Sequence, residues 1–212
     1  GYSEWGTRYK RDINGQNKVY FYISKELKLI EELRYFDESS DDLRVGLLLE
    51  YPKCCINSFL SVSNENDPFF NIKQNGHFYS NLVNCSTFSF DAAYFEHIPC
   101  SFECQQTIEK AAKFKSLLIK KYSTINNYIE FHTKSSILYT KNHGLYLFKG
   151  AKFISGNKFL INKPFKYKSN SFLVEFISDN STIECTEIGV LFNDSILIKD
   201  EYRFLNYEEN WY

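Results

Sequence analysis

The sequence predicts an α+β protein, with a mostly helical first part followed by a small antiparallel β-rich part. Two patterns predict this division. Apolar residues recur with helical spacing over much of the first 133 residues, which also hold five of the six cysteines. From residue 134 onward, short β-branched and aromatic runs alternate with turn residues. We therefore divide the sequence into a helical region, 1–133, and a β-rich region, 134–212, which are compatible with one shared core.

One strand and two helices are expected first. Lys18–Ile23 is a β-branched and aromatic run typical of a strand. A helix is expected over residues 24–34 with Ser24 as its N-cap, and a second helix over residues 41–49. Because a residue before proline tends to leave the helical region, Pro52 predicts that the helix stops there and that another begins.

The longest expected helix runs from Cys100 to Tyr122, where apolar residues recur with helical spacing and lysines cover the other side. Residues 61–74 are polar and are expected to form a loop. A short helix is expected over residues 90–95. Strands are expected at Ser136–Thr140, Gly144–Phe148, Lys158–Ile161, Phe172–Ile177, Glu187–Phe192 and Ser195–Lys199.

Two cysteine motifs share one design. Tyr51-Pro52-Lys53-Cys54-Cys55 and His97-Ile98-Pro99-Cys100-Ser101-Phe102-Glu103-Cys104 each place cysteines after a proline at an expected helix start. The positive end of the helix dipole favours the thiolate, which is the form that binds metal or attacks an electrophile. If the two helix starts meet, they create a site of four thiolates.

An iron–sulfur cluster is the favoured occupant of this site, with zinc as the alternative. Zinc suits the spacing of Cys100 and Cys104. It suits the adjacent pair Cys54 and Cys55 less well, because neighbouring side chains on a helix diverge by about 100°. A cluster accommodates diverging ligands, since its thiolates bind different irons. Cys85 is a further candidate ligand. The competing interpretation is that these cysteines are buried as small apolar side chains.

His97 lies three residues before Cys100 and is the candidate catalytic residue, as a general acid or base beside the metal, or an additional ligand. The alternative is that it caps the short helix expected before it. Cys185 is expected to be a core residue, because Ile183 shares its side of a strand.

Charge is uneven along the β-rich region. Residues 134–168 contain eight lysines and no acidic residue, whereas residues 169–212 contain nine acidic residues and two basic ones. In Phe165-Lys166-Tyr167-Lys168 lysines alternate with aromatic residues, a pattern that can bind single-stranded nucleic acid or an acidic protein. The alternative is a solvated sheet face whose lysines pair with the acidic segment of the same molecule.

The composition excludes several classes of protein. The net charge is −1, and no apolar run approaches the roughly 18 residues of a membrane span. No signal peptide is visible, so a cytoplasmic location is expected, although the absence of methionine at position 1 points to a trimmed chain. The sequence has no phosphate-binding glycine loop, no Gly-x-Ser-x-Gly and no His-Glu-x-x-His motif.

The cysteine motifs resemble the signature of an uncharacterised prokaryotic family, Tyr-Pro-x-Cys-Cys-x-x-x-Phe followed by Pro-Cys-Ser-x-x-Cys. Tyr51, Pro52, Cys54, Cys55 and Phe59 match its first half, and Pro99, Cys100, Ser101 and Cys104 match its second. The resemblance implies that the motif is a site and that the chain ends in a β-rich segment. It implies no particular reaction.

Two principal functions follow. The first is a metal-dependent protein of iron–sulfur type, and one form of this hypothesis is an enzyme that modifies a peptide or small molecule. The second is a zinc-stabilised binding module whose lysine and aromatic β face engages nucleic acid or an acidic protein. A third hypothesis is a cysteine nucleophile or redox pair without metal.

Overall fold

The structure is a computed structural model that describes residues 6–13, 16–62, 68–85, 92–162, 164–168 and 177–208. It confirms the α+β class, with helices in the N-terminal half and antiparallel strands in the C-terminal part. The chain divides into two compact units, Gly1–Ser63 and Asn64–Tyr212, which are described separately below. The division of the sequence at residue 133 stays a prediction.

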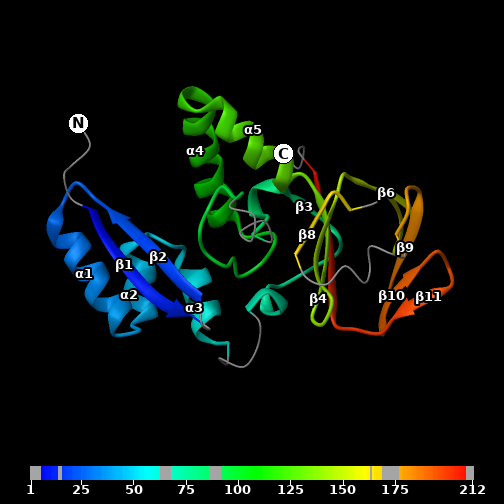
Figure 1. Cartoon of the computed structure of the whole chain (residues 1–212), viewed down its shortest axis with the longest axis horizontal. Coiled ribbons are helices and arrows are strands. Elements are labelled where there is room, and N and C mark those ends of the chain that lie inside the picture. Colours follow the sequence, from blue (N-terminus) through cyan, green and yellow to red (C-terminus); the bar gives the residue numbers. More distant parts are fainter. Residues whose placement is uncertain are drawn as a thin grey trace. The chain divides into compact units, whose positions relative to one another are not determined.

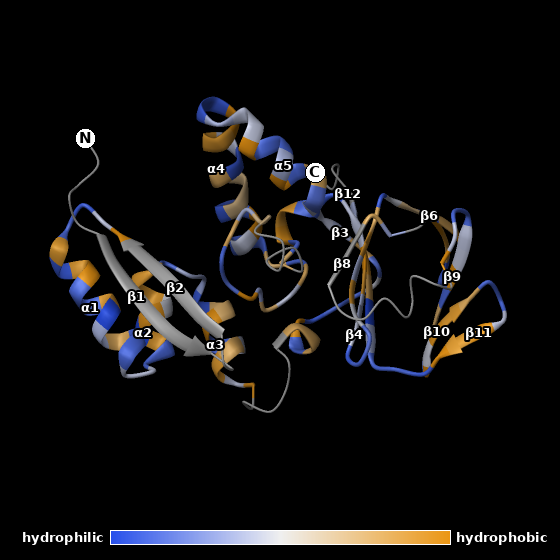
Figure 2. Ribbon diagram, in the orientation of Figure 1, coloured by the Kyte–Doolittle hydropathy of each residue, from blue (hydrophilic) through white to orange (hydrophobic). Residues whose placement is uncertain are grey.

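The first unit contains a β-hairpin and three helices (Figure 1). Its elements are β1 (Gly6–Ile13), β2 (Gln16–Ile23), α1 (Leu27–Glu38), α2 (Asp42–Leu48) and α3 (Lys53–Leu60). The hairpin is antiparallel, with Gly6 opposite Ile23. The helices show mixed polar and apolar residues in Figure 2, as expected of helices that bury one side only.

Local capping decides where the first two helices begin. α1 starts two residues later than predicted, with Glu26 as its N-cap, because the Ser24 hydroxyl accepts the N–H of Glu26 in a turn before the helix instead of capping it. Asp41 is the N-cap of α2, and its carboxylate accepts the N–H of Arg44 at 3.1 Å. The predicted break at Pro52 is confirmed, since α3 begins directly after it.

α2 and α3 approach each other closely at Gly46. A Cβ atom at this buried position would lie 2.9 Å from Cγ1 of Ile56. The absence of a side chain at Gly46 therefore makes room for Ile56, the residue that follows the cysteine pair on α3.

The second unit contains the remaining elements. They are η1 (Pro68–Asn71), β3 (Phe78–Ser80), η2 (Asn81–Val83), α4 (Gln105–Lys121), α5 (Ser123–Thr133), β4 (Ser136–Thr140), β5 (Gly144–Phe148), β6 (Ala151–Ser155), β7 (Lys158–Ile161), β8 (Lys166–Lys168), β9 (Ser181–Thr186), β10 (Gly189–Phe192), β11 (Ile196–Ile198) and β12 (Tyr202–Glu208).

These strands form two five-stranded sheets, in the orders β3-β12-β4-β5-β8 and β11-β10-β9-β7-β6. Among the described strand pairs, β3 with β12 is parallel and the rest are antiparallel. The sheet that contains β12 is buried on both faces. Its side chains alternate between two apolar cores, as Leu145 and Leu147 enter one while Tyr146 and Phe148 enter the other.

Each core lies on one face of this central sheet. The first core is shared with η1, η2, α4 and α5, and includes Ile108, Ala111 and Ile129. The second is shared with the other sheet and includes Phe159, Ile183 and Phe192. The second unit thus consists of a helical layer and two sheets, with α4 and α5 side by side in Figure 1. In Figure 2, β10 and β11 are largely apolar.

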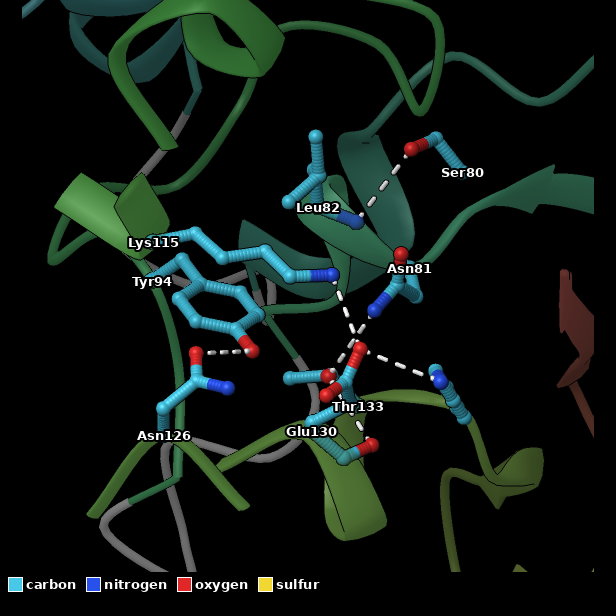
Figure 3. A network of polar contacts seen from close by, with 9 residues as sticks. Ser80, Asn81, Leu82, Tyr94, Lys115, Asn126, Glu130 and Thr133 are labelled. Atoms are coloured by element: carbon cyan, nitrogen blue, oxygen red, sulfur yellow. Dashed lines mark hydrogen bonds and ion pairs between the residues drawn. The ribbon is translucent and has the colours of Figure 1, made fainter. Parts of the chain in front are cut away.

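A polar network fastens α4 to α5 (Figure 3). The Glu130 carboxylate on α5 lies 2.8 Å from Lys115 Nζ of α4 and 3.0 Å from Lys134 Nζ. Burial alone would raise the pKa of Glu130, but the hydrogen bonds and charges of both lysines lower it to about 2. The Tyr94 hydroxyl donates to Asn126 Oδ1 at 3.2 Å. These contacts fix the helix that follows the second cysteine pair.

Most strand predictions are confirmed. β4, β5 and β7 have the predicted bounds, and β10 and β11 are shorter than predicted. The strand predicted over Phe172–Ile177 lies outside the described residues except for Ile177. The part of the predicted helix 90–95 that the structure describes, residues 92–95, is not helical. Among the described strands, β1, β3, β6, β8, β9 and β12 were not predicted. In β9 and β12, charged and polar residues interrupt the apolar pattern.

Candidate metal centre

The first pair of cysteines is placed by the start of α3. Pro52 is the N-cap, with φ of −55°, and its carbonyl accepts the N–H groups of Cys55 at 2.9 Å and Ile56 at 3.0 Å. Cys54 and Cys55 therefore occupy the first helical turn, as predicted. Cys54 is exposed and Cys55 is buried.

The two sulfur atoms of this pair lie 3.9 Å apart. This separation is far longer than the about 2.05 Å of a disulfide bond. The sequence predicts that zinc suits this adjacent pair less well, because neighbouring side chains on a helix diverge. The edge of a tetrahedron with metal–sulfur bonds of about 2.3 Å is about 3.8 Å long. The pair Cys54 and Cys55 can therefore form one edge of a single-ion site.

The second pair lies where the chain enters α4. Cys104 is the N-cap of this helix, and its carbonyl accepts the N–H of Ile108 at 3.0 Å. Cys100 lies before the helix, so the prediction that the helix begins at Cys100 is wrong. The backbone around Cys100 instead pairs with Lys73, which donates its N–H to the Cys100 carbonyl and accepts the N–H of Phe102, both at 3.2 Å. These bonds occupy the groups that a helix would need.

A tight turn connects the two cysteines. The Ser101 hydroxyl accepts the N–H of Glu103 at 3.0 Å, and the Ser101 carbonyl accepts the N–H of Cys104 at 3.1 Å. The Glu103 carboxylate in turn accepts a hydrogen bond from Asn75 Nδ2 at 3.0 Å. Glu103 therefore supports the turn, next to the Lys73 pairing.

The sulfur atoms of Cys54, Cys55, Cys100 and Cys104 all lie within 4.8 Å of one another. Cys55 and Cys104 are buried, and Cys100 is half-buried. Thiolate sulfurs at such distances form a group that could bind a metal ion.

The other two cysteines are core residues of the second unit. Cys85 is buried in the helix-side core and is not part of the four-cysteine group, so its role as a ligand stays a prediction. Cys185 lies with Ile183 in the core between the sheets, as expected. Burial raises the pKa of the Cys185 thiol to about 12, which keeps it protonated.

His97 is buried against the start of α4. Only 5% of the residue is exposed, and its Nε2 lies 2.9 Å from the Thr107 hydroxyl. Burial, with a contribution from Lys110 and a smaller opposing one from Cys104, lowers the pKa of His97 to about 4. The imidazole is therefore neutral at pH 7. Its catalytic role stays a prediction.

Four supporting residues, Lys73, Arg203, Gln74 and Phe70, were not identified from the sequence. Lys73 pairs with the backbone around Cys100, while Arg203 donates to the side chain of Gln74 and to the carbonyl of Phe70. An arginine within the aromatic and apolar run 202–207 was the available signal, since a charge in a buried strand requires a partner.

The lysine-rich stretch pairs in part with the acidic segment, which was the simpler interpretation of the charge pattern. Lys141 Nζ lies 3.1 Å from Glu201, and Lys158 Nζ lies 2.5 Å from Asp194. The side chains of residues 166–168 lie outside the described part, so binding of nucleic acid or an acidic protein stays a prediction. Among the described residues, no helix is both long and apolar enough to cross a membrane.

The fold and the cysteines thus define an α+β protein with a four-cysteine group that could bind a metal ion. The chain belongs to the family described as "Protein of unknown function (DUF483)", which matches residues 13–130, more than half of its length. This confirms membership of an uncharacterised family, while the cysteine signature stays a prediction. No curated protein and no solved structure matches the chain. The matched residues include all four cysteines and end before β4.

Proposed function

We propose that the protein binds one zinc ion through the thiolates of Cys54, Cys55, Cys100 and Cys104. The observation that carries this proposal is that the four sulfur atoms lie within 4.8 Å of one another. The 3.9 Å between the sulfurs of the adjacent pair is close to the about 3.8 Å edge of a zinc tetrathiolate.

The same distances favour a single ion over an iron–sulfur cluster. In a four-iron cluster each thiolate binds a different iron, so the sulfurs are spread around the outside of the cluster. In a single-ion site all four surround one centre. Soft thiolate ligands in a tetrahedron are typical of zinc, and also of iron. The predicted iron–sulfur cluster is therefore the alternative against which the metal must be identified.

Four protein ligands would complete the coordination of zinc and leave no position for water or a substrate. Such closed sites have structural roles, whereas catalytic zinc keeps one open position. In this protein the ion would join Cys55 to Cys100 across an intervening chain of more than forty residues. Closing so long a loop restricts the unfolded chain, so binding would stabilise the fold. The proposed function is thus a zinc-stabilised protein rather than a zinc hydrolase.

The test is the metal and acid-labile sulfide content of protein purified without oxygen. One zinc per chain without sulfide is the expected result. Iron with a matching amount of sulfide would replace this proposal with the cluster. Protein that contains neither zinc nor iron would contradict both the zinc site and the cluster. Replacement of zinc by Co²⁺ adds a spectroscopic measurement, because four thiolates around cobalt give intense visible bands typical of a tetrahedral site.

Cysteine variants locate the site. The double variant Cys54→Ser with Cys100→Ser is expected to lose tight zinc binding, by at least about 10³-fold, because two of four thiolates are removed. Cys185→Ser is the matched control, because this thiol lies in the core between the two sheets. This variant should retain one zinc. Equal metal loss in both proteins would show that the site is elsewhere.

A further inference from the structure

We propose that Arg203, 103 residues after Cys100 in the sequence, is a positioning residue of the metal centre. It would hold residues 70–74 in place, and these in turn hold the backbone of Cys100. The predicted effect of Arg203 on metal affinity rests on the proposed zinc site. The structural link itself lies entirely within the second unit.

Arg203 fastens both ends of a short segment. It lies half-buried on β12, where one guanidinium nitrogen donates to Gln74 Oε1 at 2.8 Å and another donates to the Phe70 carbonyl. A guanidinium is planar and has several donors in fixed directions, so it can hold two acceptors at once. A lysine in its place has one nitrogen and cannot reproduce this geometry.

Further contacts attach the same segment to the central sheet. Gln74 Nε2 donates to the carbonyl of Gly76 at 2.7 Å and to that of Phe204 at 3.3 Å. The Phe70 ring stacks on Tyr139 of β4, with centroids 5.1 Å apart and planes 26° apart. The segment is therefore clamped at a defined position over β12 and β4, with Lys73 between the two residues that Arg203 holds.

Lys73 links this segment to the backbone of Cys100 through hydrogen bonds. Its N–H donates to the Cys100 carbonyl and its own carbonyl accepts the N–H of Phe102, both at 3.2 Å. Cys100 lies outside α4 and lacks the helical hydrogen bonds that place Cys54 and Cys55. The Lys73 pairing therefore helps to fix the backbone that carries the Cys100 sulfur.

Metal affinity is sensitive to such support. A tetrahedral ion requires all four sulfurs at defined positions, and outer partners that orient ligands typically change affinity by about 10–100-fold. Arg203→Met keeps much of the side-chain volume but removes both donors. We expect its zinc affinity to fall by about 10–100-fold, measured by competition with a chromophoric chelator. Arg34→Met is the matched control, because Arg34 pairs with exposed Glu38 on α1, and it should keep the wild-type affinity.

A double-mutant cycle distinguishes positioning from general destabilisation. If Arg203 acts through Cys100, then Arg203→Met should have little further effect on zinc affinity in a Cys100→Ser protein, where that ligand is already lost. Equal losses of affinity in the two backgrounds would overturn the proposal. Arg203→Lys should give an affinity between wild type and Arg203→Met, because it keeps the charge but not the paired donors.

Amide hydrogen exchange in the metal-free protein tests the link without reference to zinc. The N–H groups of Lys73 and Phe102 should exchange at least about tenfold faster in Arg203→Met, while that of Cys55 should be unchanged. Unchanged exchange at Lys73 and Phe102 would overturn the positioning role. If the wild type binds no metal but this exchange increases, the proposed zinc site fails and the positioning of Cys100 by Arg203 still holds.

Discussion

The two cysteine pairs offer the same thiol groups but are built in different ways. Cys54 and Cys55 are placed by their own neighbours, because Pro52 begins the helix on which both lie. Cys100 is placed by a residue far away in the sequence, since its backbone pairs with Lys73. A local site survives most changes elsewhere, whereas a site built from distant contacts can be weakened by changes that touch no ligand.

The largest expected difference in stability between the two cysteine pairs comes from Phe102, which lies between Cys100 and Cys104 in the sequence. Phe102 is 1% exposed and contacts the rings of Phe69 and Tyr79, with centroids 5.8 Å and 5.2 Å away. Phe102→Ala should lower the free energy of unfolding by about 3–4 kcal/mol, because it leaves a cavity. Urea denaturation of the metal-free protein measures this loss.

Phe59 provides the comparison for the first pair. It lies on α3 and is 39% exposed, so Phe59→Ala should cost less than about 1 kcal/mol. A cost for Phe59→Ala equal to that of Phe102→Ala would show that both pairs depend on packing to the same degree, and the distinction would not hold.

A smaller effect is expected from the contacts that fasten α4, the helix capped by Cys104. The folded-state pKa of Glu130 is about 2, below its ordinary value of 4.5, so Glu130 stabilises the fold above pH 4.5. This contribution is lost as the pH falls toward 2. Since the side chain is partly exposed, we expect it to be about 1–2 kcal/mol.

Glu130→Gln should therefore lower stability at pH 7 by this amount and flatten the dependence of stability on pH between 4.5 and 2. Urea titrations at several pH values, on the metal-free protein, measure both. Glu109→Gln, on the exposed side of α4, is the control. An unchanged pH profile in Glu130→Gln would show that the ion pairs with Lys115 and Lys134 contribute little.

The smallest effect is expected in the turn between Cys100 and Cys104. Ser101→Ala removes the acceptor of the Glu103 N–H and should cost about 1 kcal/mol, with a modest fall in zinc affinity. Ser116→Ala is the control, because its hydroxyl donates to a carbonyl within α4 at an exposed position. Calorimetric melting of both variants measures the difference. An equal change in both would mean that the turn adds nothing specific.

The predictions from sequence succeeded where structure is local. The break at Pro52 and the bounds of β4, β5 and β7 follow from residues next to each other in the chain. The start of α4 was placed too early because nothing near Cys100 indicates that its backbone pairs with Lys73. The two cysteine motifs were identified by spacing, but the support from Arg203 depends on a contact across 133 residues, which no local pattern contains.

The burial of the central sheet on both faces makes the family-matched region incomplete as a folding module. The match ends at residue 130, within α5, yet α4 and α5 pack on strands β4, β5 and β12 that come later. β3 also takes its parallel hydrogen bonds from β12. A fragment cut after α5 would expose the apolar sides of α4 and α5 and leave the edge of β3 without its partner strand β12. Exposed apolar surface and open strand edges both promote self-association. The C-terminal strands thus cover the apolar sides of α4 and α5 and pair the edge of β3.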